Sequence, residues 1–342
     1  MKKGVFLSFL LLFLTGCSLT VQGPSIKGDT GSTRISANSL NKVAIIIPEK
    51  TIKSYSSIII NSSIAYVVRR DSNLDIKVFL IGDEDETKIR ELIKELERQD
   101  FRFIIAGFTL RGANILAAID PDMHFYIPTL HKSNTNINSS KIYFGGIDYE
   151  GQIQQLLTIT NGNIASFYDN SALSNNLNQK LINNAKSVRT YSVVGEKINF
   201  PNLIRSKGNL SGASVFLNTP LVKSAIVASQ LRSNSMYPFA VLSTQIGYNP
   251  SLLTLTQPQD RSKMYIANSI SNDDIFLSYS NEMLNQSIDY NWVAYSTSVG
   301  LDYFYSNLMN KGSSIFKEKM QNNQIIYKIK IMKALEFNFE EN

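Results

Sequence analysis

The chain is poor in the side chains on which most catalytic and metal sites depend. Its 342 residues include one cysteine and two histidines, which excludes a disulfide framework and a zinc site built from these ligands alone. No Gly-x-Ser-x-Gly sequence accompanies His124 and His131, so no serine hydrolase is indicated. Residues 107–112 have two glycines at P-loop spacing, but Ala-Asn at 113–114 stands where Lys-Ser/Thr must hold phosphate and metal. We therefore expect no enzyme and no cofactor.

Charge and composition indicate which class of protein this is. Hydrophobic residues make up 43% and charged residues 18% of the chain, which is typical of a folded globular protein. The 34 Lys+Arg against 28 Asp+Glu give a net charge of +6, and this excess is dispersed, so we expect no nucleic-acid partner. The acidic run 83–86 is interpreted as the start of a helix rather than a metal site.

The N-terminus predicts export and lipidation. Lys2 and Lys3 precede the apolar run 5–14, which is too short to span a bilayer. The run closes with Leu-Thr-Gly-Cys at 14–17, which resembles the lipobox of bacterial lipoproteins. This resemblance implies that residues 1–16 are a cleaved signal peptide and that Cys17 carries the lipid; an ordinary signal peptide containing a cysteine is the alternative.

The segment that follows Cys17 predicts a spacer. Residues 17–42 are rich in Ser, Thr, Gly and Asn, and we interpret them as a flexible tether. We therefore expect a lipid-anchored, periplasm-facing envelope protein, with the outer membrane as the first choice for the anchor and the inner membrane as the alternative.

The body alternates apolar β-branched runs with amphipathic stretches. This pattern predicts a parallel, doubly wound α/β sheet. The first unit comprises expected strands at 43–48, 75–82, 103–107 and 125–129 and expected helices at 55–69, 84–98 and 110–119. The alternation restarts near residue 140, with expected strands at 141–144, 163–168, 188–194, 212–217 and 239–243 and expected helices at 149–158, 171–184 and 221–233. A long helix is expected at 290–308 and extended chain at 324–339.

The order of these elements resembles the type I periplasmic binding protein fold, which branched-chain amino-acid receptors share with the penicillin-binding protein activator LpoA. The phrases at 242–250 and 299–304 are similar to segments of the activator family. The resemblance implies two lobes, each a mostly parallel sheet flanked by helices. We expect lobe 1 at 43–130 plus about 255–310, and lobe 2 at about 131–254 plus about 311–342. The helical N-terminal half of the activators has no counterpart here.

Candidate ligand contacts follow from the expected sheets. In open α/β sheets, ligands bind outside the carboxyl ends of the strands. The polar residues at those ends are Thr109, Arg111, Thr129, Tyr168, Asp169, Asn218 and Thr244. By the receptor resemblance, Thr109 and Thr129 would hold a carboxylate and Asp169 an ammonium group. The alternative is that these residues are helix caps around an unused cleft.

The sequence leaves two hypotheses about function. The first is a protein-binding scaffold or activator of peptidoglycan synthesis, with an envelope protein such as a peptidoglycan synthase as its partner. The second is the solute-binding receptor of an ABC importer, for a small polar ligand such as an amino acid.

Overall fold

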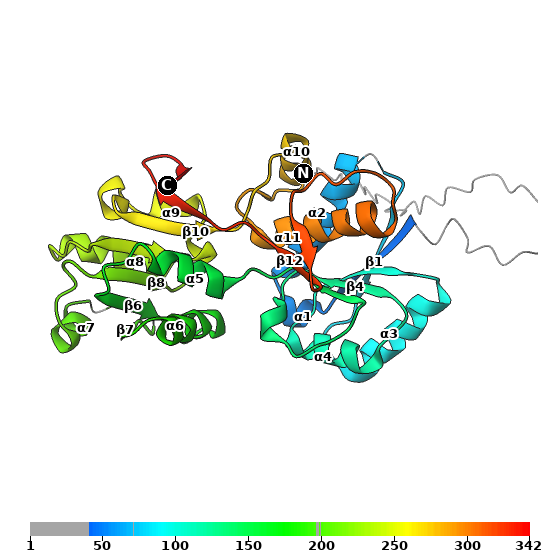
Figure 1. Ribbon diagram of the computed structural model, residues 1–342, viewed down its shortest axis with the longest axis horizontal. Coiled ribbons are helices and arrows are strands. Elements are labelled where there is room, and N and C mark those ends of the chain that lie inside the picture. Colours follow the sequence, from blue (N-terminus) through cyan, green and yellow to red (C-terminus); the bar gives the residue numbers. More distant parts are fainter. Residues whose placement is uncertain (1–40, 71, 196–197, 199) are drawn as a thin grey trace, which may run out of the picture. The chain divides into compact units, whose positions relative to one another are not determined.

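The described chain contains two seven-stranded sheets, whose strands are the arrows in Figure 1. The structure is a computed structural model that describes residues 41–342 except 71, 196, 197 and 199. The predicted signal peptide, Cys17 and all but the last two residues of the predicted tether lie outside these residues.

The first sheet has the strand order β11-β12-β5-β4-β3-β1-β2. Its strands are β1 (Lys42–Ile47), β2 (Asp75–Leu80), β3 (Phe103–Ala106), β4 (His124–Ile127), β5 (Ile142–Phe144), β11 (Lys319–Gln321) and β12 (Gln324–Ile326). Only the β11–β12 pair is antiparallel among them. The helices and turns of this part are α1 (Glu49–Ile52), α2 (Tyr55–Arg70), α3 (Glu86–Arg98), α4 (Leu110–Ile119), η2 (Lys132–Asn134), α10 (Ile275–Glu282), α11 (Trp292–Tyr303) and the π-helical turn η5 (Phe304–Leu308).

Strand β1 shows why the first sheet forms a three-layer structure. Its five residues after Lys42 are all buried, as expected for a strand covered on both faces. Val43, Ile45 and Ile47 pack into a core with side chains of α2 and α11. Ala44 and Ile46 point to the opposite face and pack with side chains of α3 and α4. Two helical layers therefore enclose the sheet.

The second sheet has the strand order β14-β13-β10-β9-β8-β6-β7. Its strands are β6 (Ile164–Tyr168), β7 (Val188–Ser192), β8 (Ser214–Asn218), β9 (Ala240–Ser243), β10 (Met264–Asn268), β13 (Lys330–Ala334) and β14 (Phe339–Glu341). The pairs that involve β13 are antiparallel and the others are parallel. Its helices and turns are α5 (Tyr149–Leu157), α6 (Ala172–Asn184), α7 (Phe200–Lys207), α8 (Leu221–Ser233), η3 (Gln245–Gly247), α9 (Ser251–Leu255) and η4 (Pro258–Arg261).

The fold class predicted from the sequence is confirmed, with corrections to single elements. The alternation restarts after β5 and not before it, because β5 pairs with β4 and so belongs to the first sheet. The expected helix at 290–308 begins at Trp292 and ends as the π-helical turn η5. Strand β10 and helices α7, α9 and α10 were not predicted. The lobe boundaries stay a prediction, while strand pairing assigns β5 to the first sheet and β10 to the second.

The phrase at 299–304 has a structural role in the first sheet's core. A Cβ on Gly300 would lie 2.2 Å from the ring of Tyr126, so only glycine lets α11 approach this closely. Asp302, 2% exposed, accepts hydrogen bonds from the Tyr66 hydroxyl at 2.7 Å and from the Arg70 guanidinium. This part of the motif therefore ties α11 to α2.

Candidate ligand-binding pocket

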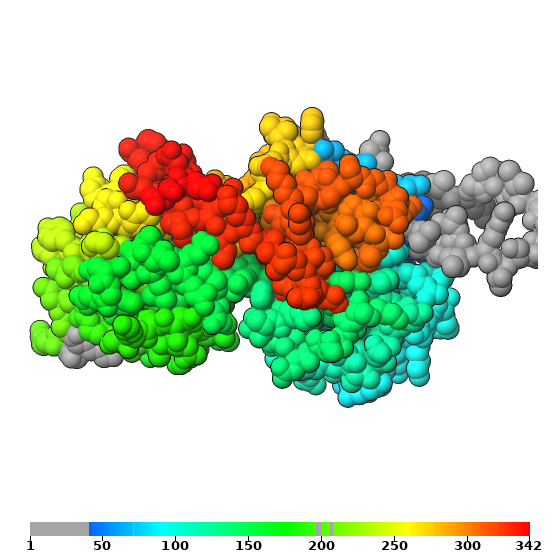
Figure 2. All heavy atoms as spheres, viewed as in Figure 1, coloured from blue at the N-terminus to red at the C-terminus, as the bar shows by residue number. Residues whose placement is uncertain are grey.

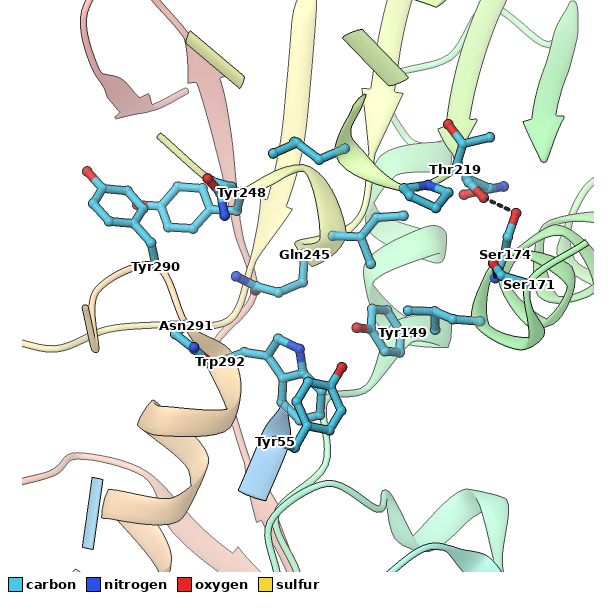
Figure 3. Close-up of a pocket in the computed structure, with 16 residues that line it drawn as sticks. Tyr55, Tyr149, Ser171, Ser174, Thr219, Gln245, Tyr248, Tyr290, Asn291 and Trp292 are labelled. Carbon is cyan, nitrogen blue, oxygen red and sulfur yellow. Dashed lines mark hydrogen bonds between the residues drawn. The ribbon is translucent and has the colours of Figure 1, made fainter. Parts of the chain in front are cut away.

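A cavity of about 330 Å³ opens where several elements begin or end (Figure 3). Asn218 lies at the end of β8, and Gln245 follows β9 by two residues. Tyr55, Tyr149 and Trp292 are the first residues of α2, α5 and α11. The cavity thus lies at the carboxyl ends of strands of the second sheet, where α/β proteins bind ligands.

The pocket lining is uncharged. None of the 16 described residues that line it is Asp, Glu, Lys, Arg or His. They are aromatic, aliphatic, amide and hydroxyl residues, together with one proline. The volume is at the lower end of the range for small-molecule sites.

Aromatic rings form one side of the pocket. Tyr55 and Trp292 meet edge to face, with ring centroids 6.2 Å apart and planes at 74°. Figure 3 shows Tyr149 on the neighbouring side of the same space. The Tyr149 hydroxyl is buried and has no hydrogen-bond partner among the described residues. Burial and the nearby Tyr55 raise the pKa of Tyr149, so its hydroxyl keeps its proton and can donate.

Amide and hydroxyl groups form the side next to β8 and β9. Asn218 is fully buried, and its Nδ2 donates to Ser166 Oγ at 3.2 Å. Its Oδ1 has no partner in the described part of the chain. The side chain of Gln245 is fixed, because its Oε1 accepts from Ser269 N at 2.7 Å and its Nε2 donates to Asn268 Oδ1 at 3.1 Å. Leaving a buried polar atom unpaired costs about 1–3 kcal/mol, so the unpaired Oδ1 of Asn218 is a destabilising feature of the side next to β8.

A second aromatic group lies at another part of the lining. Tyr248 and Tyr290 have ring centroids 5.2 Å apart, and both contact the ring of Phe339. Burial, together with Tyr290 and Asp289, raises the pKa of Tyr248 to about 12. Tyr248 is therefore an uncharged group at neutral pH.

One of the predicted ligand contacts lines this pocket, and three others are within a few residues of lining residues along the chain. Asn218 is a lining residue, whereas Tyr168, Asp169 and Thr244 are not among the residues that line it. Thr244 directly precedes Gln245, is fully buried, and its hydroxyl has no described partner.

Asp169 is already engaged inside the protein. Its Oδ2 accepts from Lys223 Nζ at 2.8 Å, and its Oδ1 accepts from the backbone N of Ser171 at 3.0 Å and from its hydroxyl at 2.6 Å. Burial alone would raise the pKa of Asp169, but Lys223 and Ser171 outweigh it and lower that pKa to about 2. This carboxylate has its counter-charge within the chain.

The remaining predicted residues lie at the carboxyl ends of β3 and β4 and do not line the pocket. Thr109 is the N-cap of α4, and its hydroxyl and backbone N both donate to the buried carboxylate of Glu84 at 2.5 Å. Thr129 donates to Phe108 O at 3.3 Å, and Arg111 is exposed. These contacts are internal, and a ligand-binding role for the three residues stays a prediction.

Sequence reasoning missed the aromatic lining. Polar residues at strand ends were considered, but aromatic residues at helix starts were not. One signal in the sequence could have indicated this lining. The chain's single tryptophan, Trp292, and Tyr290 stand on either side of Asn291, which caps the start of α11.

The described residues contain neither a membrane-spanning helix nor a metal-binding cluster. No helix within 41–342, outside the gaps noted above, has the length and apolar character of a membrane span. No three His, Cys, Asp or Glu side chains of the described chain gather in a way that could hold a metal ion.

Comparison with known proteins shows the fold. No protein-family model matches the chain, and no curated protein matches it by sequence. The leucine-binding protein LivK from Thermotoga maritima is similar in structure, with a TM-score of 0.60, 11% identity and coverage of 88% of this chain and 97% of that one. LivJ from Streptococcus pneumoniae, solved with isoleucine, has a TM-score of 0.60 and 9% identity, and the match covers 87% of this chain and 97% of that one.

The C-domain of LpoA from Haemophilus influenzae, a regulator of PBP1A, is equally similar: the TM-score is 0.59, the identity 7%, and the match covers 88% of this chain and 99% of that domain. Against full-length LpoA the match covers 59% of that chain. Amino-acid-binding proteins and a regulator of PBP1A therefore share this architecture at comparable similarity. The chain has the type I periplasmic-binding-protein fold.

Proposed function

We propose that this protein is a non-enzymatic, lipid-anchored protein of the bacterial envelope whose body is a protein-binding scaffold that activates peptidoglycan synthesis. Its partner is an envelope protein, with a peptidoglycan synthase as the first choice. The similarity to the LpoA C-domain, a regulator of PBP1A, supports this choice. Cys17 is proposed as the lipid anchor and the outer membrane as its location, on the lipobox alone.

The observation that carries the proposal is an exposed apolar face on α10. Ile275, Phe276, Tyr279 and Met283 are between 55% and 78% exposed. Residues 275, 279 and 283 follow the i, i+4, i+8 spacing of one helix face, while Leu277 is fully buried on the opposite side. Exposed apolar clusters of this kind mark protein interaction sites.

Helix α2 extends this face. Arg69 pairs with Asp274 and lies over the Phe276 ring at 5.4 Å, which fixes α2 beside the start of α10. Ile64 and Val68, one turn apart on α2, are 40% and 55% exposed. Figure 2 shows α10 in gold at the surface next to the blue residues of α2. We call Ile64, Val68, Ile275, Phe276, Tyr279 and Met283 the α10 face.

A pull-down with a matched control tests the proposal. Full-length lipidated protein in mild detergent is used as bait for envelope extract of its native cells, and bound peptidoglycan synthases are quantified. We expect the double variant Phe276→Ser/Met283→Ser to lower their recovery at least about tenfold, because exposed aromatic and Met side chains dominate such interfaces.

The control is Phe337→Ser, which removes an 84% exposed phenylalanine outside the α10 face and should leave recovery unchanged. Failure of the wild-type bait to enrich any synthase, or equal recovery by both variants, would contradict the scaffold proposal.

A second candidate function is favoured by the pocket. A solute-binding receptor needs a preformed site at the strand ends, and the pocket around Trp292 fits that need. The structural match to LivK and LivJ supports the same candidate. Transport assays in cells with and without the gene separate the two: a receptor is required for uptake of its solute, whereas a scaffold is not.

A further inference from the structure

We propose that two copies of this chain bind each other through the end of the second sheet at which β9 and β10 begin. In this dimer, Phe337 of each copy enters an apolar cavity of the other copy, which we call the β9–β10 pocket. The dimer surface shares no residue with the α10 face, so the dimer and the scaffold are tested separately.

The β9–β10 pocket is a cavity of about 360 Å³ with a mostly apolar lining. Its apolar residues come from the second half of α8, the segment before β9 and β9 itself: Ala228, Leu231, Met236, Tyr237, Pro238 and Val241. Tyr237 is 68% exposed, and Phe239, two residues further on, is 49% exposed. An apolar hollow with exposed aromatic side chains is typical of an interaction site, and this volume is sufficient for one large aromatic side chain.

Three charged side chains also line the β9–β10 pocket, and one of them has no counter-charge. Arg232 is ion-paired with Asp260 and donates to Gln257 Oε1 at 2.8 Å. Lys263 is exposed; its Nζ donates to Pro238 O at 3.4 Å and forms no ion pair with any residue that the structure describes. The pocket therefore favours an apolar side chain that has a negative charge beside it.

The turn between β13 and β14 presents such a side chain. Phe337 is 84% exposed and follows Glu336, which is exposed and has no ion pair among the described residues. The backbone N of Leu335 donates to Asn338 O at 2.9 Å and closes the turn. The buried guanidinium of Arg261 donates to the carbonyl oxygens of Leu335 at 2.8 Å and of Glu336 at 2.6 Å. Phe337 thus stands on a fixed backbone, which reduces the entropy lost when it binds.

The β9–β10 pocket and this turn lie at the same end of the second sheet. Near its start β10 pairs in parallel with β9, with Met264 beside Val241, so the segments that precede both strands meet there. Strand β13 runs antiparallel to β10, with Lys333 beside Tyr265, so the turn that follows β13 is also at this end. Figure 1 shows the red end of the chain, which contains the turn, beside the yellow chain that leads into β10.

This placement favours a closed dimer with two-fold symmetry, in which every contact occurs twice. Phe337 of one copy fills the pocket of the second copy, and Phe337 of the second copy fills the pocket of the first. Glu336 of each copy then lies near Lys263 of the other, which supplies the counter-charge that each group lacks within its own chain. The chain itself therefore carries both the pocket and the acidic aromatic turn that matches it.

Sedimentation equilibrium of the full-length lipidated protein in an excess of density-matched detergent measures the mass of the protein without that of the micelle. We expect wild type to reach the mass of two chains below about 100 µM. Phe337→Ser should weaken the dimer at least about tenfold, because an aromatic side chain is lost from both contacts. The control is Val222→Ser, which removes a 58% exposed side chain at the start of α8, outside the β9–β10 pocket, and should change nothing.

Charge reversal tests the orientation of the two copies. Glu336→Lys and Lys263→Glu should each weaken the dimer, because like charges then face each other at both contacts. An equal mixture of the two variants should regain the wild-type affinity, since each contact of the mixed dimer again joins a lysine to a glutamate. Misfolded variants would not regain it, and melting curves of each variant check the fold directly.

Four results would overturn the proposal: a wild-type monomer at every concentration up to about 100 µM, unchanged affinity in Phe337→Ser, a charge-variant mixture that stays monomeric, or masses that rise beyond two chains. A pocket that takes a different protein or a small apolar molecule would give the first of these. Phe337→Ser remains the control of the synthase pull-down, since loss of the dimer leaves the α10 face intact. We thus expect this variant to lose the dimer and keep the synthase, and the two proposals fail separately.

Discussion

Replacing Asp169 with asparagine separates an internal role of this carboxylate from a ligand-binding role. Asp169 is 4% exposed, and both of its oxygens are used, one by Lys223 Nζ and the other by Ser171. Asparagine keeps the shape of the side chain but removes the negative charge. Lys223 then lacks its counter-charge, and the hydrogen bonds from Ser171 become weaker because they no longer meet an ionised acceptor.

The pKa of Asp169 sets the size and the sign of the effect. Burial acts to raise this pKa, but Lys223 and Ser171 outweigh burial and lower the pKa from 3.8 to about 2. A carboxyl group whose pKa falls on folding stabilises the protein above its unfolded pKa, and this stabilisation disappears as the pH drops through the folded value. The difference between 3.8 and about 2 corresponds to roughly 2 kcal/mol of folding free energy. It should be complete at neutral pH and lost between about pH 4 and pH 2.

Urea unfolding of wild type and Asp169→Asn between pH 7 and about pH 3 measures this contribution. The matched control is Asp83→Asn, which breaks the ion pair with Lys88, where both side chains are about half exposed, and should change stability little. We expect Asp169→Asn to be less stable by roughly 2 kcal/mol at pH 7, with the gap narrowing below pH 4. Equal loss in the two variants, or a gap that does not change with pH, would refute this reasoning.

Three further predictions follow from single positions. Cys17→Ala should move the protein from the detergent phase to the aqueous phase in Triton X-114 partition, or leave uncleaved precursor, because no other residue supplies the thioether sulfur. Gly300→Ala should destabilise the protein by about 1–3 kcal/mol in urea unfolding, since the new methyl would lie 2.2 Å from the Tyr126 ring. Asp302→Ala should cost about 3–5 kcal/mol in the same assay, because it leaves the Arg70 guanidinium, 12% exposed, without its partner.

Each of these predictions has a control or a contradicting result. Detergent-phase partition of cleaved Cys17→Ala protein would contradict the lipid anchor. Gly312→Ala is the control for Gly300, since its methyl would meet the nearest atom, on Tyr305, only at 3.2 Å; equal effects would contradict the packing argument. For Asp302→Ala, a loss of folding free energy no larger than that of Asp83→Asn would show that the buried pair of Arg70 and Asp302 contributes little to stability.

The elements that the sequence revealed are those with a strong local pattern. Helix α3 was predicted from the apolar stripe of Ile89, Leu92, Ile93 and Leu96. All of these are buried except Leu92, which is partly buried. Strand β1 was predicted because its run of β-branched residues needs burial on both faces. Such patterns depend only on neighbouring residues, so one sequence is enough to detect them.

The elements and contacts that were missed depend on distant partners. Strand β10 has five residues without a clear alternation, and its pairing with β9 and β13 comes from the sheet. Asp169 was expected to face a ligand by the receptor resemblance; its ion pair with Lys223, which lies 54 residues away, has no local signal in the sequence. The pocket collects side chains from seven separate elements, at positions as far apart as Tyr55 and Trp292, and no local pattern marks them as a group.

Photo-crosslinking from the α10 face tests the central claim, docking of an envelope partner, most directly. A photoreactive benzoylphenylalanine replaces Phe276 in the lipidated protein in living cells, and the crosslinked product is identified by mass spectrometry. The same replacement at Phe337 is the control, since both side chains are well exposed, at 64% and 84%. We expect a peptidoglycan synthase crosslinked from position 276 and not from position 337; crosslinks to no synthase from position 276, or the same products from both positions, would contradict the account.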